Sequence, residues 1–163
     1  MASRGTLNNP RPTGIIRAFY RAPIWIYRAG LGFLMGKRFL LLEHVGRRSG
    51  KTRYTVLEVV RHDQQADTYV VCSGWGTRAD WFRNIRKMAE VRVSSGFRRR
   101  LSARAIRLEG DAAARELCSY AERYPQAFRI LVSRLVMGEE GPVDCAEAAA
   151  EIPVLALKVA RRG

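Results

Sequence analysis

The sequence is poor in the residues that build metal sites and disulfide frameworks. Its 163 residues include three widely spaced cysteines, Cys72, Cys118 and Cys145, and two histidines, His44 and His62. No CxxC, HxxxH or similar ligand spacing is present, so no zinc or iron–sulfur centre is expected. An odd, sparse cysteine set is also more typical of a reducing cytoplasm than of a disulfide framework. The sequence therefore predicts no metal and a cytoplasmic location.

A long uninterrupted apolar segment is also missing. The longest apolar stretch, Ala22 to Gly36, contains Arg28 and is shorter than the roughly 20 residues that a spanning helix needs. Arg17, Arg21 and Arg28 are spread through the apolar positions instead of preceding them, which is unlike a secretory signal peptide. No transmembrane helix is predicted.

Negative charge is scarce. There are 29 Lys plus Arg against 15 Asp plus Glu, which gives a net charge of +14. Such a charge attracts anions: nucleic acid, anionic lipid, or a phosphorylated or polycarboxylate ligand. Because no RRM-like aromatic strand motif, homeodomain or zinc-finger pattern is present, no nucleic-acid partner is predicted. For Arg98, Arg99 and Arg100 the pattern indicates only a solvated strand.

The length and the 47% content of hydrophobic residues suit one domain with one core. Met1 to Thr13 contains Asn8-Asn9-Pro10 and Pro12 and is predicted to be a disordered leader. Residues 14–163 then form a single domain.

The domain is expected to begin with a basic amphipathic helix. Apolar and aromatic residues recur there at helical spacing between arginines: Ile15, Ile16, Phe19, Ile26 and Tyr27. Such a helix can lie on the inner face of the plasma membrane with Trp25 and Tyr27 at headgroup level. It can also pack on the domain with its cations in water, as most amphipathic helices of small domains do.

Short β-type segments dominate the rest. Strands are expected at 39–45, 54–61, 68–73, around 91–93, at 101–108 and at 152–160. Helices are expected at 80–87, capped by Asp80 with Trp81, Ile85 and Met88 on one face, at 112–123, capped by Asp111, and from Pro125 onward. Connections of hairpin length require antiparallel pairing. The predicted fold is α+β, a small antiparallel barrel or curled sheet with peripheral helices.

The most basic turn is a candidate anion site. Gly46-Arg47-Arg48-Ser49-Gly50-Lys51-Thr52-Arg53 joins the first two predicted strands. Glycines let the backbone turn and present N–H groups, and the cations add charge and bidentate donors, so this tip can clamp phosphate oxygens. It can also be an ordinary solvated turn, because the Walker pattern and an opening GxGxxG are both absent.

A second candidate segment lies between a predicted strand and a helix start. It runs Ser73-Gly74-Trp75-Gly76 and continues through Asp80, Trp81 and Asn84. Small residues and helix N-terminal N–H groups allow a flat ligand or an anion to approach the backbone closely. Trp81 could form a wall for a ring or pack in the core.

Together the two segments resemble the deazaflavin-dependent nitroreductase family of actinobacteria and archaea. The resemblance rests on G-R-R-S-G-K-x-R, then S-G-x-G, then D-W-F-R-N-I followed by V-R-V, with R-A-P-x-W-x-Y-R as a lead-in at Arg21 to Arg28. It extends from about Ile15 to Leu108.

The resemblance implies a split β-barrel of the flavin-reductase and pyridoxamine-phosphate-oxidase type. It also implies coenzyme F420, an 8-hydroxy-5-deazaflavin that donates hydride to quinones, nitroaromatics or similar acceptors, with no general base needed. Arg48, Ser49 and Arg53 fall on the family's clamp for the phosphate and polyglutamate tail, and Ser73 and Gly74 fall on its ring-binding strand end. The predicted coenzyme-binding residues are Arg48, Ser49, Gly50, Arg53, Ser73, Gly74, Gly76 and Trp81.

Some positions depart from the family pattern. Gly74 stands where a lysine is common, Val56 stands where a proline is frequent, and the loop before Trp81 is shorter. The acceptor therefore stays open, with Tyr20, Tyr27, Tyr120 and Tyr124 as candidates for lining its pocket or donating a proton. Open alternatives are an FMN-binding oxidoreductase on the same barrel and a non-enzymatic basic protein of membrane surfaces. A homodimer is a further expectation.

Overall fold

The computed structural model of the chain describes residues 36–133 and 144–160. The predicted leader 1–13 and the predicted basic helix that follows it lie outside the described residues. Membrane contact through that helix therefore stays a prediction. None of the helices in the described ranges has the length and apolar character needed to cross a bilayer.

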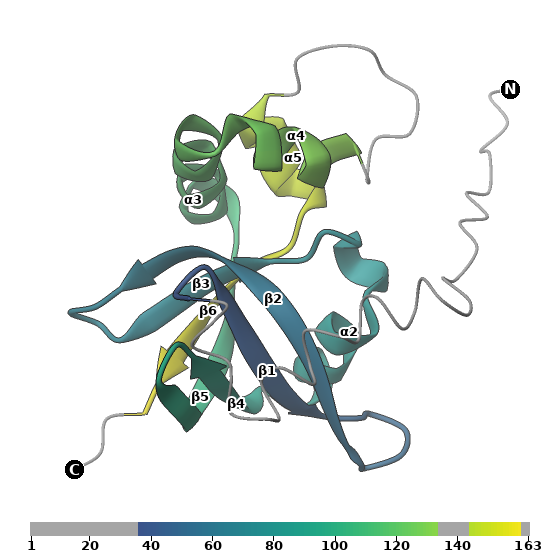
Figure 1. The fold of residues 1–163 in the computed structure, drawn as a ribbon. Coiled ribbons are helices and arrows are strands. Elements are labelled where there is room, and N and C mark those ends of the chain that lie inside the picture. Colours follow the sequence, from purple (N-terminus) through teal and green to yellow (C-terminus); the bar gives the residue numbers. More distant parts are fainter. Residues whose placement is uncertain (1–35, 134–143, 161–163) are drawn as a thin grey trace, which may run out of the picture.

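The described residues form a closed antiparallel barrel in the order β1-β2-β3-β6-β5-β4 (Figure 1). The strands are β1 Phe39–Val45, β2 Thr52–Asp63, β3 Thr68–Cys72, β4 Glu90–Ser95, β5 Arg98–Leu108 and β6 Val154–Val159. Every neighbouring pair is antiparallel. The predicted α+β split barrel is confirmed, and closure leaves no open sheet edge among the six described strands.

Side-chain alternation fills the barrel interior. Leu40 and Leu42 of β1 are fully buried, and Leu40 lies opposite Leu57 of β2. Helix α2, Asp80–Lys87, adds Phe82 and Ile85 to the same apolar cluster. The helix therefore closes the barrel at the end where the β1–β2 hairpin turns.

A second core lies on the outside of the barrel. Three helices cover it: α3 Gly110–Arg123, α4 Pro125–Ser133 and α5 Cys145–Glu151. Leu117, Phe128 and Ile152 pack there against the strand residues Val70 and Val154. Figure 1 shows these helices gathered on one side of the barrel, apart from α2.

Two predicted helix caps and one predicted face are wrong. Ala79 is the N-cap of α2 and Glu109 is the N-cap of α3, so Asp80 and Asp111 lie inside the first turns. Carboxylates in a first turn still favour the helix through its dipole, which gives a similar sequence signal. Met88 is the C-cap of α2, just beyond the helix, and is exposed. Helix α5 was not predicted, because its seven residues are too short to show a clear periodicity.

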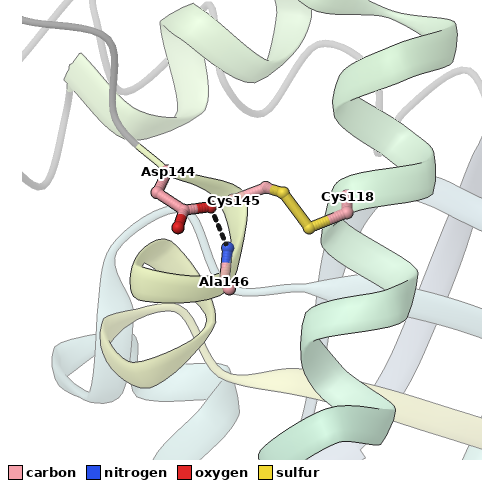
Figure 2. The surroundings of a disulfide bond; sticks show 4 residues. All are labelled: Cys118, Asp144, Cys145 and Ala146. Atoms are coloured by element: carbon pink, nitrogen blue, oxygen red, sulfur yellow. Dashed lines mark hydrogen bonds between the residues drawn. A yellow bond between two sulfur atoms is a disulfide. The ribbon is translucent and has the colours of Figure 1, made fainter.

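The expectation of reduced cysteines is also wrong. Cys118 of α3 and Cys145 of α5 form a disulfide across a sequence separation of 27 (Figure 2). Cys145 directly follows Asp144, whose carboxylate accepts a hydrogen bond from the backbone N–H of Ala146 and caps α5. The disulfide removes the cysteine argument for a reducing compartment, because disulfides persist mainly in oxidising ones. Cys72 is the free cysteine among the described residues.

Reduction of this disulfide should destabilise the protein. Closing a loop with a sequence separation of 27 lowers the conformational entropy of the unfolded chain. In the loop-entropy model this stabilises the folded state by about 3.5 kcal/mol. We expect the urea midpoint to fall on addition of a reductant. A Cys118→Ser/Cys145→Ser variant should have the lower midpoint both with and without the reductant. The midpoint of Cys72→Ser should fall on reduction as that of the wild type does. Equal midpoints with and without reductant would show that the crosslink does not stabilise the fold.

Candidate functional site

The tip of the β1–β2 hairpin is a compact turn that needs its glycines. The N–H of Gly46 donates to the Lys51 carbonyl and that of Gly50 donates to the Gly46 carbonyl, both at 2.8 Å. A Cβ at Gly46 would lie 2.8 Å from Ser49 Oγ and 3.3 Å from the Lys51 carbonyl oxygen, and Gly50 has a φ of +65°. The two glycines flank the cations and fix how the tip presents them.

One of the tip arginines is used inside the protein. The guanidinium of Arg47 lies 3.1 Å from Asp80 Oδ1 and donates from Nη1 to Asn84 Oδ1 at 2.9 Å. Its backbone N–H also donates to Asn84 Oδ1, at 3.1 Å, and Lys87 Nζ donates to its carbonyl at 3.3 Å. Asp80, Asn84 and Lys87 follow the i, i+4, i+7 spacing of one helix face, so α2 holds the tip with that face.

Asn84 also connects the tip to a buried histidine. Its Nδ2 lies 3.2 Å from Nδ1 of His44, and both side chains are buried. Burial and the nearby positive charge of Arg53 lower the pKa of His44 to about 4, although Asp80 opposes this. His44 is therefore neutral at neutral pH.

The other tip cations face solvent. Arg48, Lys51 and Arg53 are exposed, and none of them has an acidic partner among residues 36–133 and 144–160. Within the same ranges no group accepts a hydrogen bond from the backbone N–H of Arg48 or Ser49. Unpaired cations beside free N–H groups on a glycine-shaped turn are what a phosphate or carboxylate ligand requires. The tip is therefore a candidate anion site.

The turn that follows β3, from Ser73 to Gly76, is held together by its own hydrogen bonds. Ser73 is fully buried, and its hydroxyl donates to the Gly76 carbonyl at 2.7 Å. The Ser73 N–H donates to Pro153 and its carbonyl accepts from Gly76 N–H, both at 2.9 Å. Gly74 is half-buried, whereas Trp75 is exposed. Of the predicted residues here, Ser73 and Gly76 shape the turn with their hydrogen bonds, and Gly74 offers its backbone.

Trp81 lies in the barrel core. It is buried in the interior cluster, and its ring meets that of Phe82 edge-on with centroids 6.1 Å apart. This geometry favours core packing over a wall for a ligand ring.

The tyrosine candidates differ in their surroundings. Tyr20 and Tyr27 lie outside the described residues. Tyr120 is buried in the outer core, where desolvation and the carboxylate of Glu58 raise its pKa and keep the phenol protonated. Tyr124 is exposed, with the Arg38 guanidinium 5.4 Å from its ring centroid.

Cys72 is a packing residue of the outer core. Burial raises the pKa of its thiol to about 12, so it is not a reactive thiolate. No cluster of metal-ligating side chains occurs in the part of the chain that the structure describes.

Sequence reasoning missed how Arg47, Asp80 and His44 are used. Asp80 was expected to cap a helix, and instead it pairs with Arg47. The available signal was the i, i+4 spacing of Asp80 and Asn84, which places two hydrogen-bond acceptors one turn apart. Which basic turn these two acceptors contact depends on how the barrel closes.

The closed antiparallel barrel is a split barrel, and its cationic, glycine-flanked hairpin is a candidate anion site. Residues 19–135 match the sequence model of the F420H(2)-dependent quinone reductases. This match covers well over half of the chain, so the chain belongs to that family. It is an F420-dependent oxidoreductase, and coenzyme F420 is its cofactor. No curated protein sequence matches this chain closely enough to serve as a relative.

Solved structures show the same fold at low identity. An F420-H2 dependent reductase (FDR-A) matches with a TM-score of 0.54 and 21% identity, over 76% of this chain and 96% of that chain. The heme storage protein HutZ from Vibrio cholerae matches with a TM-score of 0.53 and 14% identity, over 84% and 92%. A chain described as a domain-swapped dimer matches with a TM-score of 0.53 and 18% identity, over 84% and 100%. These likenesses concern the fold alone, and the expected homodimer stays a prediction.

Acid should destabilise the protein through His44. Its pKa is about 4 in the folded state against an ordinary value of 6.5, so the unfolded chain binds an extra proton between these values. Stability is then lost as the pH falls through this window, by up to about 3 kcal/mol. We expect the free energy of unfolding in urea to fall more steeply with acid in the wild type than in His44→Gln.

Other groups also titrate in this window, so the difference between variants is the measurement. A Ser95→Ala variant, which removes a buried hydroxyl that does not titrate, should retain the wild-type slope. Identical slopes for His44→Gln and the wild type would contradict a buried neutral His44.

Proposed function

We propose that this protein holds reduced coenzyme F420 at the β1–β2 hairpin and transfers its hydride to a quinone. The proposal is carried by one observation, that the cations of the tip have different contacts. Arg47 is bound to α2, whereas Arg48, Lys51 and Arg53 are exposed without an acidic partner in the described ranges. A hairpin anchored by one arginine can present the other cations to an anionic ligand without losing its position.

The hairpin residues would bind the charged part of the coenzyme. The guanidinium groups of Arg48 and Arg53 can each donate two hydrogen bonds to a phosphate or carboxylate. The free N–H groups of Arg48 and Ser49 add donors whose position the turn already fixes. Lys51 adds a mobile point charge.

The rest of the site would orient the coenzyme and exclude water. Bound reduced F420 supplies the hydride, and the protein supplies binding, orientation and electrostatics. Gly74 is half-buried and has no side chain, so a flat ring could approach the backbone of the turn there, and Trp75 is an exposed aromatic beside it. The chemistry requires no described side chain to act as a general base.

The acceptor is proposed to be a quinone because the family is defined by quinone reduction. Quinones are electron-poor and can accept a hydride. Nitroaromatics share this property and are the competing acceptor class.

Removal of the two exposed arginines should weaken coenzyme binding. Arg48→Ala/Arg53→Ala deletes two charge-assisted contacts, and the dissociation constant for F420 should rise roughly 30- to 150-fold. Quenching of coenzyme fluorescence on titration measures this constant. The matched control is Arg99→Ala/Arg115→Ala, which removes the same charge from exposed arginines away from the hairpin.

The control double variant should bind like the wild type at moderate salt. A parallel titration with FMN tests the alternative cofactor. Equal affinity of the two double variants for F420 would refute the hairpin as the coenzyme site, and tighter binding of FMN than of F420 would favour the flavin alternative.

The proposed acceptor can be tested by turnover. Purified protein with reduced F420 should oxidise the coenzyme faster with a soluble short-chain quinone than with a nitroaromatic compound of similar size, as compared by kcat/KM. The control is the Arg48→Ala/Arg53→Ala variant, in which KM for the coenzyme should rise with both acceptors. A higher kcat/KM for the nitroaromatic would reassign the acceptor class.

A further inference from the structure

A single buried amide joins the hairpin to α2 and to β1. Asn84 is 5% exposed. Its Oδ1 accepts hydrogen bonds from both the backbone and the side chain of Arg47, while its Nδ2 faces His44 Nδ1. The acidic partner of Arg47 is Asp80, whose side chain is 80% exposed, and exposed ion pairs contribute little.

The two ends of this amide are not interchangeable. The backbone N–H and Nη1 of Arg47 are both donors, so the amide oxygen must point to them. The amide nitrogen then points to His44, which has to accept at Nδ1 and carry its proton on Nε2. His44 is neutral because burial lowers its pKa to about 4. The Arg47 donors thus select one orientation of the amide, and His44 accepts from the amide nitrogen in that orientation.

We propose that Asn84 is a positioning residue for the coenzyme, because its buried amide, which also contacts the His44 ring, fixes Arg47 and with it the hairpin that carries Arg48, Lys51 and Arg53. This inference rests on the proposed hairpin site. Asn84 is too deeply buried to bind the coenzyme's charged groups itself. It acts by keeping the hairpin in one arrangement before the ligand arrives, so that less freedom is lost on binding.

Loss of the amide should loosen the tip without opening the barrel. The interior cluster keeps Trp81, Phe82 and Ile85 of α2 in place. The hairpin would retain the exposed Asp80 contact and the 3.3 Å contact of Lys87 with the Arg47 carbonyl. The expected result is weaker coenzyme binding in a protein that is still folded.

The experiment compares three variants of the full chain by coenzyme titration. Asn84→Leu keeps the size of the side chain and removes its polar atoms, so the dissociation constant for F420 should rise roughly tenfold. Asn84→Asp retains an acceptor for Arg47, and His44 can then donate from Nδ1, so its affinity should stay within roughly threefold of the wild type. Ser95→Ala is the matched control, because it removes a buried hydroxyl that donates to the Phe39 carbonyl at the other end of β1.

Limited trypsin cleavage gives a readout that needs no coenzyme. The tip contains Arg47, Arg48, Lys51 and Arg53 as cleavage sites. Cleavage there should accelerate in Asn84→Leu and stay at the wild-type rate in Asn84→Asp and Ser95→Ala. In turnover, Asn84→Leu should raise KM for the coenzyme and leave kcat nearly unchanged.

A variant at the partner residue keeps the test valid if Asn84→Leu does not fold. Arg47→Met retains the aliphatic stem and loses the guanidinium, so it should reproduce the weaker binding. The inference is overturned if the wild type binds F420 and Asn84→Leu binds it equally well, or if Asn84→Asp is as weak as Asn84→Leu. If the wild type binds no F420, the proposed function fails, and unchanged trypsin cleavage in Asn84→Leu would overturn the anchoring separately.

Discussion

The hydrogen bonds between Arg47 and helix α2 connect the barrel core to its charged surface. On its apolar face α2 closes the barrel with Phe82 and Ile85, and on its polar face it holds the hairpin through Asn84. One short helix therefore fills the end of the core and fixes the position of the cationic turn. The buried apolar face supplies most of the stability of this arrangement, and the Asn84 amide fixes the position of the hairpin through Arg47.

The ion pairs show which part of the net charge of +14 is left uncompensated. Several arginines are paired on the barrel surface: Arg61 binds Glu116, Arg98 binds Asp67, and Arg92 and Arg100 share Glu43. Asp67 is held ionised because the Arg98 guanidinium lowers the pKa of its carboxyl. With so many acids engaged elsewhere, the hairpin keeps uncompensated charge where an anion can reach it.

Much of the fold was predictable because strand alternation and turn residues are local signals. Residues 39–45 were predicted as a strand and form β1, and Pro125 opens α4 as expected. Helix α5 was missed because it is short. The disulfide that joins it to α3 was missed as well, because its partners are 27 residues apart. Spacing in the sequence cannot show that Cys118 and Cys145 face each other, because that depends on how α3 and α5 pack.

The sequence by itself determined the antiparallel strands and the glycine-flanked cationic turn, because backbone freedom, alternation and charge are properties of neighbouring residues. It also placed Arg48 and Arg53 at the candidate site. Only the tertiary structure decided that Arg47 is an anchor while Arg48 faces solvent, and that Trp81 and Ser73 are buried. Adjacent arginines are chemically identical, so their roles differ only through what barrel closure brings beside each: Asn84 and Asp80 for Arg47, and solvent for Arg48.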